Sequence, residues 1–184
     1  MLTLDQLNTF LDSAQAAGWH VRQKNGPLLL NPTIAARYPH LPPDYALFLS
    51  QVAECVNAKQ NAWVLTEADF NADIGDDEST FRWNEWERMG LEAFQDDVDV
   101  SRRISQFWTN HIPVMNAVHS DYAYIALRIT DGAVVYGYGP EFEDSVADVC
   151  VSFAEYLTEL GNVIGGRSPR EVNGAVRRQY TDFQ

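Results

Sequence analysis

The stretch IPVMNAVHSDYAYIALRITDGAVVYGYG, residues 112–139, decides the fold, because its apolar side chains recur at every second position. Such alternation is typical of a β-strand, whose successive side chains point to opposite faces of a sheet. In the middle run, one face would carry Ala123, Ile125, Leu127 and Ile129, and the other Tyr122, Tyr124, Ala126 and Arg128. Thr130-Asp131-Gly132 is a short turn of the hairpin type between the last two runs. The pattern therefore predicts an antiparallel meander near residues 112–138.

Helical patterns lie on both sides of this meander. Helices are predicted at residues 3–18, from Pro43, at residues 99–110 and after Ser152. Thr3 and Gln6 fit a capping box, and Asp99 or Ser101 could cap the third helix. A chain of 184 residues is long enough for one domain. We therefore expect a single α+β domain over residues 1–184, with a mainly antiparallel sheet flanked by helices.

Three further segments carry weaker patterns. WHVRQKNGPLLLN (19–31) holds two short β-prone runs around Asn25-Gly26-Pro27, which predicts either a small hairpin or a loop. AWVLT (62–66) favours a strand. The basic C-terminal tail, residues 165–184, is either a short helix or frayed.

Negative charge is concentrated in one part of the chain. The net charge is −13, which argues against direct binding of nucleic acid or anionic lipid, since both need clustered Lys and Arg. Residues 67–99 hold twelve acids against Arg82 and Arg88, a net charge of −10. This acidic segment is either a solvated face or the source of a field that steers a basic partner toward the protein.

Composition also bears on the compartment. The N-terminus lacks the basic region and the unbroken apolar run of a signal peptide, and no apolar run is long enough to span a bilayer. The chain has only two cysteines, Cys55 and Cys150, for which two buried thiols are a better interpretation than a disulfide framework. We expect a cytoplasmic protein.

Motifs for catalysis, cofactors or metals find little support in the sequence. The four histidines are scattered, and no phosphate-binding loop or nucleophile elbow is present. His119-Ser120-Asp121 contains the residue types of a catalytic triad, but neighbours in sequence do not supply its geometry. Asp73, Asp76, Asp77 and Glu78 do not follow the ligand register of a calcium loop, although a weak divalent site stays open. We predict no catalytic, cofactor-binding or metal site.

The acidic segment runs into FRWNEWERMG, residues 81–90. Trp83, Trp86 and Met89 recur at a spacing of three, which predicts a short amphipathic helix. Two interpretations stand side by side: the tryptophans belong to the core, or one of them is an exposed interface anchor with a rim of carboxylates.

Three segments stand out by their order and spacing: LPPDYALFLSQV (41–52), FWTNHIPVMNAVHSDYAYIALRITDGAVVYGYG (107–139) and VCVSFAEYLTEL (149–160), which together span residues 41–160. They resemble the SUKH superfamily, in the branch of fungal cell-wall-assembly regulators and bacterial immunity proteins. The resemblance is to the order and spacing of a Leu-Pro helix, a tyrosine-bearing meander and a Ser-Phe helix. Against that family core (about 41–160), the acidic residues about 67–99 look like an insertion. The loops at residues 56–62 and 118–121 depart from the family pattern.

The resemblance implies a non-enzymatic immunity protein that binds and neutralises a toxin domain. The acidic segment suits a toxin with a basic surface, such as a nuclease. Trp83 or Trp86 is the predicted anchor. The charges predicted to steer the partner and to form the rim of the interface are Asp76, Asp77, Glu78, Glu85, Glu87, Asp96 and Asp97. A regulatory adaptor of the cell-wall-regulator type and a carboxylate-dependent hydrolase are the alternatives.

Overall fold

An antiparallel sheet runs through the molecule, as the alternating pattern predicts. The computed structural model describes residues 1–72, 81–118, 122–138, 146–167 and 183. The strands of this described part are β1 (His20–Gln23), β2 (Val52–Val56), β3 (Ala62–Val64), β4 (His111–Val118), β5 (Tyr122–Arg128), β6 (Val134–Tyr138) and β7 (Ala147–Cys150). They form one sheet in the order β1 to β7, and each strand pairs antiparallel with its neighbours in sequence. The predicted meander corresponds to β4–β6, and the α+β class is confirmed.

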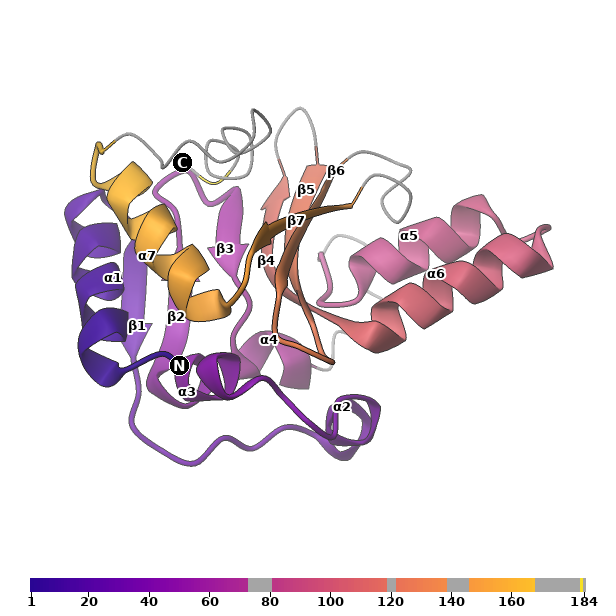
Figure 1. The fold of residues 1–184 in the computed structure, drawn as a ribbon, viewed down its shortest axis with the longest axis horizontal. Coiled ribbons are helices and arrows are strands. Elements are labelled where there is room, and N and C mark those ends of the chain that lie inside the picture. The colour runs from indigo at the N-terminus through magenta and orange to yellow at the C-terminus, as the bar shows by residue number, and fades with distance from the viewer. Residues whose placement is uncertain (73–80, 119–121, 139–145, 168–182, 184) are drawn as a thin grey trace.

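Helices cover both faces of this sheet (Figure 1). They are α1 (Leu4–Ala16), α2 (Pro32–Arg37), α3 (Pro43–Gln51), α4 (Glu67–Asn71), α5 (Glu85–Ala93), α6 (Val98–Asn110) and α7 (Phe153–Ile164). Helices α1 and α7 lie side by side on one face, while α5 and α6 form an antiparallel hairpin that projects away from the sheet (Figure 1). The hairpin is therefore the part of the described chain that extends furthest from the central sheet.

Strand β5 shows how the two faces are filled. Ala123, Ile125 and Leu127 belong to a first core that also contains side chains of α1, α3 and α7. Tyr124 and Ala126, from the alternate positions, belong to a second core with side chains of α5 and α6. The predicted assignment of β5 side chains to opposite faces is confirmed, but the second face is buried under the hairpin.

Helix caps follow the sequence signals with one difference. The Thr3 side chain accepts a hydrogen bond from the Gln6 N–H and completes the capping box that begins α1. The Ser152 hydroxyl accepts from the Glu155 N–H at the start of α7. Asp97, rather than Asp99 or Ser101, caps α6, because its carboxylate accepts the N–H groups of two first-turn residues.

Other differences arise where a strand pairs with a distant segment. Of the two alternatives predicted for residues 19–31, the structure shows the loop: β1 is followed by no local hairpin and pairs with β2, with His20 opposite Val56. Strand β2, which the sequence pattern did not predict, begins at Val52, directly after the last residue of α3. The predicted tail lies outside the described residues from 168 onward, apart from Phe183, whose side chain is fully buried in the first core.

Gly137 is required by a close approach between β5 and β6. It lies opposite Tyr124 in the strand register, and a Cβ at position 137 would overlap the Tyr124 ring. The tyrosine ring thus lies over the glycine backbone and fills the space that a side chain would take. This contact places Tyr124 in the second core, against the base of the hairpin.

Replacing Gly137 with alanine should therefore destabilise the protein. We expect a loss of about 1–3 kcal/mol in the free energy of unfolding, the usual cost of overpacking a tight core. The matched control is Gly26→Ala, since nothing lies within 4 Å of a Cβ built there. Urea denaturation of both variants measures the difference, and equal stabilities would contradict the proposed role of Gly137.

Candidate partner-binding hairpin

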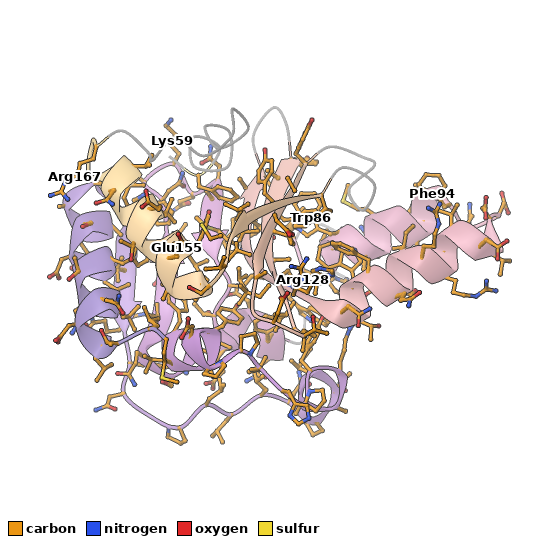
Figure 2. All side chains as sticks on the ribbon, viewed as in Figure 1. Lys59, Trp86, Phe94, Arg128, Glu155 and Arg167 are labelled. Carbon is orange, nitrogen blue, oxygen red and sulfur yellow. The ribbon has the colours of Figure 1, made fainter. Side chains whose placement is uncertain are left out.

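Trp86 fixes the base of the α5–α6 hairpin to the sheet. Its side chain is 0% exposed, and its ring lies 5.2 Å from that of Phe81 and 5.3 Å from that of Tyr124 between centroids. The indole Nε1–H donates a 2.8 Å hydrogen bond to Oδ1 of Asn116 on β4. Figure 2 shows Trp86 beside the sheet, at the near end of the hairpin. Trp86 therefore belongs to the second core and offers no surface for the predicted role of a partner anchor.

Trp83 also packs within the molecule. It is partly buried, and its ring lies 6.2 Å from Tyr38 and 5.7 Å from Phe70 between centroids. The guanidinium carbon of Arg37 lies 5.6 Å from the Trp83 centroid, within range of a cation–π contact. Trp83 thus joins α2 and α4 to the start of α5. The spacing of Trp83, Trp86 and Met89 predicts that Trp83 is part of this helix, but α5 begins at Glu85, two residues later.

Glu87 pairs with Arg37 and joins α5 to α2. The guanidinium donates from Nη1 to Oε2 at 2.8 Å and from Nη2 to Oε1 at 2.9 Å, a bidentate geometry. Burial alone would lower the pKa of Arg37, but the hydrogen bond and the attraction to Glu87 outweigh it, so the pKa is raised. Beside this pair, the Tyr38 hydroxyl donates to the Trp108 carbonyl at 2.9 Å, and burial raises the pKa of the tyrosine.

Glu85 is likewise engaged inside the protein. It is 7% exposed and accepts from Nε of Arg88 at 3.0 Å, while Glu87 is 9% exposed. The expectation that these two carboxylates form the rim of an interface does not match their burial. Glu87 joins α5 to α2, whereas Glu85 pairs with Arg88 within α5 itself.

The remaining predicted residues divide into two groups. Asp76, Asp77 and Glu78 lie outside the described residues and stay a prediction. Asp96 and Asp97 are exposed in the connection between α5 and α6. They lie between two further exposed acids, Glu92 and Asp99, whose side chains are 70% and 86% exposed. The far end of the hairpin thus carries solvent-exposed negative charge.

Two apolar side chains at this end were not among the predicted site residues. Phe94 is 36% exposed and Val98 is 69% exposed. The buried residues of α6, Ile104 and Trp108, are spaced by four, and Val98 does not continue that stripe. With the cap placed at Asp97, helical periodicity would have identified Val98 as an outward-facing apolar residue.

Comparison with protein-family models, curated proteins and solved structures finds no match for this chain. The described residues contain no group of three or more His, Cys, Asp or Glu side chains that could hold a metal ion. None of the helices in the described ranges has the length and apolarity needed to cross a bilayer.

The buried pair predicts a specific loss of stability on neutralisation. Glu87→Gln should lower the free energy of unfolding by about 1.5–3 kcal/mol, the range for hydrogen bonds to charged groups, because Arg37 loses its counter-ion in a partly dry site. The control is Glu92→Gln, the same change at an exposed carboxylate on the same hairpin, which should have little effect. Chemical denaturation at pH 7 measures both, and similar losses in the two variants would contradict this role of Glu87.

His111, at the junction of α6 and β4, predicts a pH dependence. Its ring stacks on Phe107 at 4.2 Å, and Nδ1 lies 2.9 Å from the Phe107 carbonyl oxygen. Burial is the main cause that lowers its pKa below 6.5, and the hydrogen bond to Phe107 opposes it in part. Between the lowered pKa and 6.5 the unfolded chain binds more protons than the folded one, so stability falls as the pH falls through this window.

His111→Asn should remove this component of the pH dependence. Urea midpoints measured from pH 7.5 to pH 5 should decline less steeply in this variant than in the wild-type protein. His40→Asn, the same change at an exposed histidine, should keep the wild-type slope. If His111→Asn kept the wild-type slope, His111 would not be the cause of the decline in stability at low pH.

Proposed function

We propose that this chain is a non-enzymatic immunity protein that binds a toxin domain with a basic surface and blocks its action. The observation that carries the proposal is the exposed, acidic end of the α5–α6 hairpin, which projects from the body of the protein (Figure 1). The resemblance of residues 41–160 to the SUKH superfamily supports the same function. A cytoplasmic location belongs to this proposal, and the buried thiol of Cys55 is compatible with it.

The hairpin end has the charge distribution that electrostatic steering requires. Residues 91–99 contain Glu92, Asp96, Asp97 and Asp99 and no cation, and Arg102 and Arg103 follow on α6. All four carboxylates are exposed. Glu92 pairs with Arg88 at 3.2 Å and Asp99 with Arg102 at 2.7 Å, but the acids outnumber the arginines at this end, and their field extends into solvent over roughly 8–10 Å at physiological salt. Charges of this kind mainly raise the association rate with an oppositely charged partner.

Other acids of the predicted segment support the structure instead. Glu67 pairs with Lys24, Asp69 completes the capping box of α4, and Glu85 and Glu87 pair with arginines. The acids proposed to contact the partner are therefore only some of those in residues 67–99. Among the described residues it is confined to the end of the hairpin.

Charge reversal at this end tests the proposal. An immunity gene is expected to lie beside the gene of its toxin, so the probe is the product of the gene adjacent to that of this chain, in a catalytically inactive form. Binding is followed by stopped-flow fluorescence at several salt concentrations. Glu92→Lys with Asp96→Lys should slow association roughly tenfold at low salt and weaken its salt dependence. Asp97 is left unchanged because it caps α6.

The matched control is Asp5→Lys with Asp12→Lys, which makes the same change in net charge on the exposed side of α1. It should change the association rate much less. Equal effects of the two double variants, or no binding between the wild-type protein and the toxin domain, would refute the proposal.

A further inference from the structure

The far end of the hairpin presents apolar surface in the middle of its exposed charge. Phe94 is the C-cap residue of α5 and Val98 is the first residue of α6, and both side chains reach solvent. Phe94, labelled in Figure 2, lies on the projecting part of the hairpin, away from the sheet. Glu92, Asp96 and Asp97 lie next to these two residues in the chain. An apolar centre with a charged rim is the usual composition of a protein–protein interface.

Hydrogen bonds fix the turn that carries these side chains. The Phe94 carbonyl accepts from the Asp97 N–H at 2.9 Å and from the Ser101 hydroxyl at 2.9 Å. The Asp97 carboxylate accepts from the N–H groups of Asp99 at 3.1 Å and Val100 at 3.0 Å. The turn is thus ordered before any partner binds, which lowers the entropic cost of binding.

Folding gives no reason for an apolar residue at position 98. The second core takes Ile104 and Trp108 from α6, whereas Val98 leaves more than two thirds of its surface in water. Valine is also a poorer helix former than alanine, so it does not serve helix stability at this position. An apolar side chain held in this position is suited to burial against another molecule.

We infer that Phe94 and Val98 anchor the toxin domain by inserting into an apolar pocket ringed by Lys and Arg. This inference rests on the proposed function and adds the contact that sets the lifetime of the complex. The carboxylates of the hairpin end specify a basic rim, and the projection of the hairpin specifies a concave site (Figure 1). A second copy of this chain is disfavoured as the occupant, because it would bring two acidic ends together.

Val98→Ala tests the anchor without disturbing the fold. Removal of two methyl groups from a buried contact should raise the dissociation rate of the toxin domain roughly tenfold and leave the association rate nearly unchanged. The matched control is Val151→Ala, the same substitution at a valine that is 79% exposed and lies just before α7. The control should leave both rates unchanged, and thermal unfolding should show that both variants are folded.

Phe94→Ala gives a second measurement, with an expected increase in the dissociation rate larger than that of Val98→Ala. The inferred anchor role would be overturned if Val98→Ala and Phe94→Ala dissociated at the same rate as Val151→Ala. If charge reversal at Glu92 and Asp96 still slows association in that case, the proposed function stands and only the anchor fails. If the wild-type protein does not bind the toxin domain, both fail together.

Discussion

The sheet is apolar on both faces where β4, β5 and β6 lie together, and the rest of the structure depends on covering both. One face is covered by α1, α3 and α7, which supply the first core. The other face carries Tyr124, Ala126 and Val135, and these side chains are buried only because a second layer of helices covers them. The α5–α6 hairpin provides that layer, and the hydrogen bond from Trp86 to Asn116 satisfies the indole N–H inside it. The base of the hairpin is therefore part of the core.

This constraint separates the structural and binding parts of the acidic segment. Residues near the sheet, such as Glu85, Glu87 and Trp86, are buried and engaged with partners in the same chain. Residues 92–99, at the far end of the hairpin, are all exposed. A rigid base and a free end are what a binding element needs, because the position of its contact residues is set before the partner arrives.

Local signals in the sequence predicted much of this fold. Period-two alternation identified β4–β6, and capping residues located α1 and α7, because both depend on neighbouring residues. Strand β2 was missed because its pairing with β1 joins Val56 to His20, across the whole of α2 and α3. For the same reason, the pairing of Glu87 with Arg37, fifty positions apart, could not be predicted, and Glu87 was assigned to an interface. Helical periodicity could have predicted that Val98 is exposed, if Asp97 had been recognised as the N-cap of α6.

Hydrogen–deuterium exchange of the protein alone and in complex with the toxin domain tests the central claim most directly. The account predicts new protection at the end of the hairpin, residues 91–103, with little change at its already buried base. The alternative surface is the groove of about 580 Å³ between α1 and α7, which lies apart from the hairpin. Protection along that groove, with unchanged exchange at residues 91–103, would contradict the account.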